Sequence, residues 1–203
     1  MTLEVAHINK AFGGRQVLRD LSFSLGGGEA MALLGANGAG KTTLLRIVTL
    51  LIAPDSGSVL FDGHPMVQAD LSRVGYLPEE RGLYRHMRAM EQAVYLCRLK
   101  GMSRADAERS LHSWFARLGM EGWERRQAAS LSKGMQQRLQ LAVAVAHNPS
   151  LLILDEPFSG FDEQNADMLK TLIGELRNEG TAILLSTHNT QAALDLCGKT
   201  TRL

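Results

Sequence analysis

A glycine-rich segment near residue 40 holds the residue types that bind a phosphate chain. Residues 35–43, with the sequence GANGAGKTT, match the pattern G-x-x-x-x-G-K-[ST] at every fixed position. The glycines let backbone N–H groups approach an anion closely, and a helix that follows directs its positive dipole end at the same charge. Lys41 should reach the β- and γ-phosphates of a nucleoside triphosphate, and the Thr42 hydroxyl should ligate Mg²⁺. The nucleotide contacts predicted from this segment are Gly35, Asn37, Gly38, Ala39, Gly40, Lys41, Thr42 and Thr43.

Two adjacent acidic residues follow an apolar run in the second half of the chain. Residues 151–154, LLIL, lead directly into Asp155 and Glu156. Open α/β folds bind ligands at the carboxyl edge of the sheet, where such a strand would deliver both carboxylates. Asp155 is therefore predicted to hold Mg²⁺, through water, and Glu156 to orient or deprotonate an attacking water. A strand that ends in an ordinary polar turn is the alternative, and the upstream Lys41 and Thr42 argue against it.

The surrounding elements are those that this chemistry needs. Residues 30–34 are typical of a buried strand and residues 44–48 of a helix, so the glycine-rich segment joins a strand to a helix. A turn with a purely backbone role would not require the complete pattern. The unbroken apolar runs at 151–154 and 182–185 indicate strands covered on both faces of a parallel sheet. Between them, residues 168–176 place apolar side chains at the spacing of a crossover helix.

Other segments predict antiparallel strands and a group of helices. Residues 2–8 and 17–25 are predicted strands separated by a turn at Phe12-Gly13-Gly14, and residues 59–61 form another strand before a turn. From about residue 89 to 118 the apolar spacing becomes helical, with a break and an N-cap candidate at 101–103. The predicted fold class is α/β: a phosphate-loop NTPase core with a mostly parallel sheet, an antiparallel β portion and a helical lobe.

The length and composition allow one substantial domain. A chain of 203 residues can bury roughly 70% of its unfolded surface. We expect residues 1–203 to form a single domain, with an ATP-binding core at 1–85 and 148–203 and a helical lobe at about 86–147. The formal net charge of +1, without a basic block, does not indicate a nucleic-acid partner. No secretion signal or membrane-spanning run is apparent, so any membrane role is expected to come through a partner.

Three further motifs give the chain a specific resemblance. Residues 131–138, LSKGMQQR, look like the signature motif of ATP-binding cassette (ABC) ATPases, and they precede the Asp155–Glu156 strand by one helix, as in that family. Residues 159–162, SGFD, look like the loop that follows the acidic strand, and residues 186–188, STH, resemble the switch histidine segment. The resemblance implies that the nucleotide is ATP and that Mg²⁺ accompanies it.

The resemblance also implies that two chains share each nucleotide site. Ser132 and Gly134 would begin a helix from about 133 to 147, where a hydroxyl, backbone N–H groups and a helix dipole meet at one point. In the family this point closes over the γ-phosphate held by the opposite subunit, and Asp162 reaches across the same interface. An ordinary Ser N-cap would have the same local sequence.

Two more nucleotide contacts follow from the resemblance alone. His188 would contact the γ-phosphate or the attacking water, although a lone His after a strand is usually structural. Phe12 resembles the aromatic residue that stacks on adenine. A surface aromatic residue without that role is the alternative for Phe12.

The sequence departs from the family pattern at three places. Residues 75–84, GYLPEERGLY, place Glu79 where the family usually has Gln, and a carboxylate there can still ligate Mg²⁺. This loop resembles that of bacterial ABC exporter subunits related to sodium-extrusion and drug-export ATPases. A weakened metal site with slower turnover is the alternative. Lys133 replaces the first glycine of the signature, and the chain ends at Leu203, where relatives normally continue.

The functional hypothesis is an ATP-hydrolysing ABC transporter subunit. It would work as a homodimer or as a heterodimer with a second cassette, bound to a separate membrane permease, for export. Its expected location is cytoplasmic, peripheral on the inner face of the cell membrane. A soluble ABC ATPase that remodels a ribosome or DNA is one alternative, and a regulator that binds ATP without cleaving it is another.

Overall fold

The structure is a computed structural model that describes residues 1–80, 82–159 and 163–203. Its N-terminal part forms an antiparallel sheet with the strand order β2-β1-β4-β5. The strands are β1 (Thr2–Phe12), β2 (Arg15–Gly26), β4 (Ser56–Phe61) and β5 (His64–Pro65). Gly13 and Gly14 join β1 to β2, and both have positive φ values, as a two-residue hairpin turn of this hand requires. The predicted hairpin is confirmed, and its strands extend further toward the turn than the sequence indicated.

A parallel sheet forms the centre of the molecule. Its order is β6-β7-β8-β3-β9, and every neighbouring pair is parallel. The strands are β3 (Ala30–Leu34), β6 (Val74–Leu77), β7 (Leu151–Asp155), β8 (Ala182–Thr187) and β9 (Lys199–Arg202). The apolar runs at 151–154 and 182–185 therefore lie in adjacent strands that are buried throughout, as predicted.

The helices predicted from apolar spacing at about 44–48, 89–118 and 168–176 are confirmed, and so is the helix predicted after Ser132. Ser103 caps α3, because its Oγ accepts a hydrogen bond from the Asp106 N–H at 3.1 Å. The helices are α1 (Lys41–Val48), α2 (Ala89–Leu99), α3 (Arg104–Arg117), α4 (Lys133–Val145), α5 (Glu163–Asn178) and α6 (Thr190–Leu196), with short 3₁₀ turns η1 (Gln68–Arg73) and η2 (Ala128–Ser130). None of the helices in the described residues is both long and apolar enough to cross a lipid bilayer.

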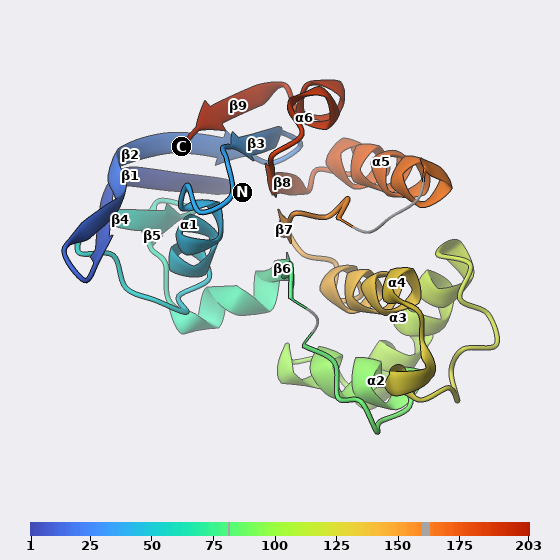
Figure 1. Ribbon diagram of the computed structural model, residues 1–203. Helices are drawn as coiled ribbons and strands as arrows, with labels where there is room; N and C mark the ends of the chain where they lie inside the picture. The colour runs from blue at the N-terminus through green and yellow to red at the C-terminus, as the bar shows by residue number, and fades with distance from the viewer. Residues whose placement is uncertain (81, 160–162) are drawn as a thin grey trace.

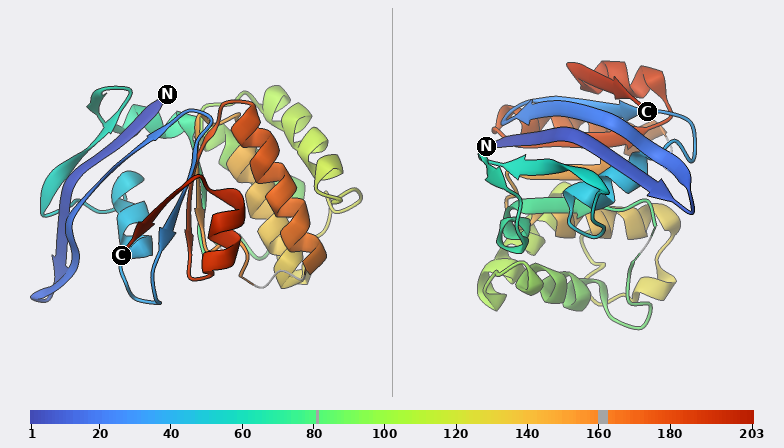
Figure 2. Two further views of the ribbon diagram at one scale, coloured as in Figure 1. Left: turned by 90° about the horizontal axis from the view of Figure 1, so that it is seen from above. Right: turned by 90° about the vertical axis from the view of Figure 1, so that its left-hand side faces the viewer.

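The two faces of the parallel sheet support two separate hydrophobic cores. Alternate residues such as Leu33, Ile153 and Leu184 pack with α1 and the antiparallel sheet. The intervening residues, such as Leu154 and Leu185, pack against the helices on the other side. Figure 2 shows this layering from above: the antiparallel sheet, α1, the parallel sheet, and then the larger helices. The predicted α/β fold class is thus confirmed.

This layering places the sequence motifs at one edge of the parallel sheet. β3, β7 and β8 run in the same direction, so their carboxyl ends meet at that edge (Figure 1). The glycine-rich segment leaves β3 there, the two acids end β7, and the 186–188 segment ends β8.

Candidate active site

The glycine-rich segment forms a tight loop from β3 into the first turn of α1. Gly40 precedes the helix with φ 104°, and no side chain of the described residues caps the helix at this position. A Cβ at Gly40 would lie only 2.9 Å from Val17 Cγ1 and Leu18 Cδ2. The position therefore requires glycine both for its backbone angle and for space. The free N–H groups at the start of α1 are those that favour an anion.

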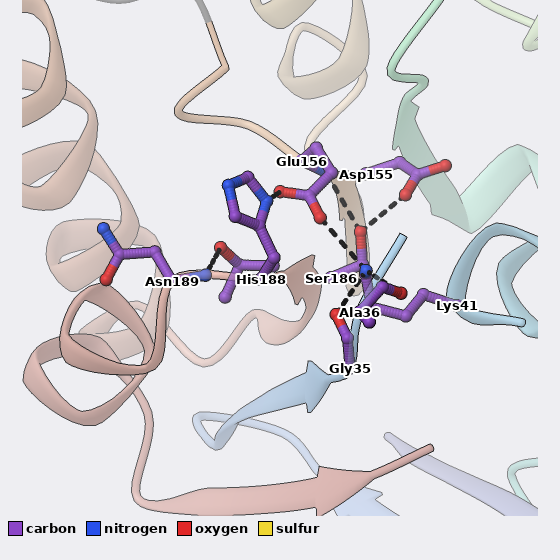
Figure 3. Close-up of polar contacts among 9 residues, drawn as sticks. Gly35, Ala36, Lys41, Asp155, Glu156, Ser186, His188 and Asn189 are labelled. Carbon is purple, nitrogen blue, oxygen red and sulfur yellow. Dashed lines mark hydrogen bonds and ion pairs between the residues drawn. The ribbon is translucent and has the colours of Figure 1, made fainter. Parts of the chain in front are cut away.

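Lys41 is held within this loop by backbone carbonyls. Its side chain is buried, and Nζ donates hydrogen bonds to Gly35 O at 2.8 Å and Ala36 O at 3.2 Å. The same ammonium lies 3.3 Å from Glu156 Oε1 in an ion pair. Figure 3 shows Lys41 between the loop carbonyls and the Glu156 carboxylate. A lysine of the first segment and an acid of the second thus meet at one point.

Asp155 and Glu156 are both buried at the end of β7, with 1% and 7% of their surface exposed. Asp155 Oδ1 accepts a hydrogen bond from Ser186 Oγ at 2.5 Å, whereas Oδ2 is buried without a hydrogen-bond partner in the described structure. Glu156 Oε2 lies 3.0 Å from His188 Nδ1. His188 itself is largely exposed, so its ring reaches from solvent to a buried carboxylate.

The loop and the acids line a common cavity of about 420 Å³. The sequence predicted eight of its nine lining residues, including Glu79 in the loop after β6, and Val17 is the ninth. The full lining is Val17, Asn37, Gly38, Gly40, Lys41, Thr42, Thr43, Glu79 and Glu156. Val17 lies on β2 and was missed, because an isolated valine in a strand carries no signal of ligand contact.

A second cavity of about 380 Å³ adjoins the first, because both include Thr42 and Glu79. Asp155 lines this second cavity together with Tyr76. Burial, followed by the nearby Asp155 charge, raises the pKa of the Tyr76 hydroxyl to about 12. The three predicted metal ligands, Thr42, Glu79 and Asp155, therefore face one continuous space.

Several predicted nucleotide contacts do not line these two cavities. Gly35 and His188 line a separate cavity of about 370 Å³, and Ala39 lines neither of the first two. Phe12 is 50% exposed near the hairpin turn, with the Lys10 ammonium 5.4 Å from its ring, and it does not line either cavity. Ser132 caps α4 by accepting a hydrogen bond from Met135 N–H at 3.3 Å, and neither it nor Gly134 lines these cavities. Asp162 lies outside the described residues.

Sequence comparison agrees with the fold. The ABC transporter family profile matches residues 18–159. The chain therefore belongs to the ABC transporter family and contains the ATP-binding domain of that family. Domains of this kind hydrolyse ATP to power transport.

Several proteins are similar to this chain over most of its length. It is 42% identical to the ABC transporter ATP-binding protein YhaQ of Bacillus subtilis, over 96% of this chain and 65% of the relative. It is 40% identical to an ABC transporter ATP-binding protein of Methanocaldococcus jannaschii, over 97% of this chain and 72% of the relative. The lantibiotic transport ATP-binding protein SrtF of Streptococcus pyogenes is 32% identical, over 92% and 80%. The chain thus spans about two thirds of the length of YhaQ.

Solved structures give the same result for the fold. An ATP-binding subunit of an ABC transporter superposes with a TM-score of 0.91 at 30% identity, covering 100% of this chain and 86% of that one. The protein cbiO1 of Clostridium perfringens superposes with a TM-score of 0.83 at 24% identity, over 98% and 83%. The second likeness concerns the fold alone.

Proposed function

We propose that this chain binds Mg-ATP and hydrolyses it as the ATPase subunit of an ABC transporter. One observation carries the proposal: Lys41, Thr42 and Glu156, from two distant segments, line one polar cavity at the carboxyl edge of the parallel sheet. Phosphate-binding and water-activating groups must meet in this way for hydrolysis. The presence of Glu156 and His188 favours an ATPase over a regulator that only binds ATP.

The phosphate loop would hold the triphosphate. Its backbone N–H groups and the start of α1 would face the phosphates, and Thr43 and Asn37 line the same cavity. Lys41 would exchange its contact with Glu156 for the β- and γ-phosphate oxygens. This exchange would free Glu156 Oε1 to accept a proton from water. Phosphate binding would therefore be coupled to release of the general base through the Lys41 ammonium.

The acids fit a magnesium ion. Asp155 Oδ2 is a buried carboxylate oxygen without a hydrogen-bond partner among the described residues. Asp155 lines the same cavity as Thr42 and Glu79. Mg²⁺ in such sites takes one or two carboxylates together with substrate phosphates. We therefore propose Thr42, Asp155 and Glu79 as the residues that would hold it. The ion, when bound, would neutralise developing charge on the phosphates.

Glu156 is the proposed general base, and His188 its partner. The 3.0 Å contact between His188 Nδ1 and Glu156 Oε2 holds the carboxylate from the side opposite Lys41. Glu156 would accept a proton from the attacking water. His188, which is exposed on its outer side, would contact the γ-phosphate or that water.

A second cassette would complete the site. Ser132 and Gly134 begin α4, a helix of 13 residues, and they do not line the nucleotide cavity of their own chain. The N–H groups and dipole at this position suit the γ-phosphate held by a partner. We propose that Phe12 stacks on adenine. The partner is a second copy or a different cassette.

The permease would dock on the helical side of the molecule. Its proposed site is an apolar cavity of about 310 Å³ between the loop after β6, α2 and α4, lined by Tyr76, Pro78, Leu83, Leu96, Leu99 and Val143 among others. Leu99 is 67% exposed there. We propose residues 86–147 as a lobe that couples this cavity to the ATP site, and a peripheral location on the cytoplasmic face of the membrane.

The names of the relatives support a transporter over a soluble ATPase that remodels a ribosome or DNA, because they are ABC transporter and lantibiotic transport proteins. We propose export on the resemblance of the 75–84 loop. Transport into inverted membrane vesicles, with the permease present, decides the direction. No nucleic-acid partner is proposed.

The hydrolysis proposal is tested by phosphate release from Mg-ATP. Glu156→Gln keeps the size of the side chain but removes the proton acceptor, so turnover should fall by about 10²- to 10⁴-fold. Nucleotide affinity should stay near the wild-type value, because the phosphate loop is intact. Near-normal hydrolysis by Glu156→Gln would show that Glu156 is not the base.

A further inference from the structure

Ser186 lies between the two acids of the active site, and the proposed mechanism leaves its side chain without a role. It is the last residue but one of β8, and it is fully buried. In the parallel register Ser186 pairs with Asp155 across β7 and β8. Paired residues on adjacent strands share a face of the sheet, so both side chains point toward α1 and the phosphate loop.

The Ser186 hydroxyl donates its hydrogen bond to Asp155. The distance from Oγ to Asp155 Oδ1 is 2.5 Å, as expected for a hydroxyl that donates to a carboxylate. This bond uses one carboxylate oxygen and leaves Oδ2 as the unpartnered oxygen described above. Figure 3 shows one Asp155 oxygen directed at Ser186 and the other directed away from it. The rotation of the carboxylate is therefore fixed by one neighbouring hydroxyl.

The same hydroxyl accepts a hydrogen bond from the backbone of Glu156. Glu156 N–H lies 3.0 Å from Ser186 Oγ and 3.2 Å from Ser186 O. Glu156 has φ 46°, in the left-handed region that non-glycine residues rarely adopt. Strict strand alternation would send the Glu156 side chain to the face opposite Asp155. The left-handed turn instead brings its carboxylate to Lys41, and Ser186 holds the N–H of that turn.

We propose that Ser186 is a positioning residue for ATP hydrolysis, because one buried hydroxyl fixes both the Asp155 carboxylate and the backbone turn of Glu156. This inference rests on the proposed function. The role needs a group that donates and accepts at once, which a hydroxyl does and a methyl group does not. Ser186 acts through the two acids and does not itself touch the nucleotide.

The test compares Ser186→Ala and Ser186→Cys with a control in the same strand region. Thr181→Val removes another buried hydroxyl, which donates to Pro149 O at the opposite end of β8. Two properties are measured on the full chain, after circular dichroism shows it folded. The first is kcat and KM for Mg-ATP. The second is the affinity for Mn²⁺ in the presence of a non-hydrolysable ATP analogue, followed by electron paramagnetic resonance.

Both Ser186 variants should lower kcat by about 10- to 100-fold and weaken Mn²⁺ binding by about tenfold, as loss of a group that orients a metal ligand does. The KM for ATP should change by less than about threefold, because the phosphate loop is untouched. Thr181→Val should change neither property. Folded Ser186 variants with wild-type kcat and Mn²⁺ affinity would overturn the proposal.

The failure of the proposed function would give a different result. If the wild-type chain released no phosphate from Mg-ATP, the ATPase proposal would fail. The Mn²⁺ comparison between wild type and Ser186→Ala would still decide whether Ser186 orients Asp155.

Discussion

The carboxyl edge of the parallel sheet and the start of α4 both offer groups that suit a phosphate. They differ in burial and in how many contacts their side chains make within the chain. At the sheet edge, Lys41, Asp155 and Glu156 are buried. Lys41 forms an ion pair with Glu156, and Asp155 accepts a hydrogen bond from Ser186. At the start of α4, Ser132 is exposed and makes only a helix cap, and a Cβ on Gly134 would meet nothing within 4 Å.

The difference indicates what fixes the positions of the side chains in each region. The sheet edge is arranged within one chain, because strand pairing fixes where each side chain lies. The start of α4 has an open surface, so under the proposed function its phosphate contact would come from a second chain. The same substitution, glycine to alanine, should therefore act differently in the two regions.

Gly40→Ala should have the largest effect of these substitutions. The new methyl group meets Val17 and Leu18 at 2.9 Å, and the backbone keeps a φ of 104°. The substitution should introduce about 1–3 kcal/mol of strain. If the loop moves to relieve this strain, it loses the shape that binds phosphate, and the affinity for Mg-ATP should fall by about 10- to 100-fold. Isothermal titration calorimetry measures this loss.

Gly63→Ala is the matched control, with φ +82° and open space in the antiparallel sheet. It should lower stability while leaving ATP affinity unchanged. If Gly40→Ala binds Mg-ATP as tightly as the wild type, the loop does not bind nucleotide in the conformation seen in this structure.

Gly134→Ala should have an intermediate effect that depends on pairing. Alanine stabilises a helix relative to glycine, so the melting temperature of the single chain should rise by an amount equivalent to about 0.5–1 kcal/mol. The added methyl group should hinder the approach of a partner's phosphate, and hydrolysis should fall about tenfold. Mg-ATP affinity of the monomer should not change. Full hydrolysis in this more stable variant would place the start of α4 outside the active site.

Glu79→Gln should have the smallest effect. It restores the amide that the family usually has, and removes one negative charge beside Thr42 and Asp155. The Mg²⁺ concentration for half-maximal hydrolysis should rise by about two- to fivefold, with kcat little changed. Glu4→Gln, in β1, removes the same charge from another sheet and serves as the control. An unchanged Mg²⁺ requirement would remove Glu79 from the proposed metal ligands.

Much of this arrangement was predictable from sequence because its signals are local. The glycine loop, the apolar strands and the Asp155–Glu156 pair each identify themselves within a few residues, and the structure brings Lys41 and Glu156 to 3.3 Å. The edge strand β9 was not predicted, since its exposed residues, KTTR, lack the apolar pattern of the central strands. Among the strands that the structure describes, it pairs only with β3.

The contacts that depend on strand register could not be predicted. Ser186 appeared in the sequence only as part of the segment before His188. Its bond to Asp155 requires β8 to lie beside β7 with these residues opposite each other. Val17 enters the nucleotide cavity for a similar reason, because the packing of β2 against the loop decides it.

The central claim is that each ATP site combines the phosphate loop of one chain with the start of α4 of another. The most direct measurement mixes two inactive variants, Lys41→Ala and Ser132→Glu, and follows phosphate release. Each variant alone leaves every site of its own dimer defective. In the mixture, half of the dimers should hold one intact site, so about a quarter of the wild-type rate should return. If the mixture is as inactive as the separate variants while mixed dimers form, the two residues act within one chain and the claim is wrong.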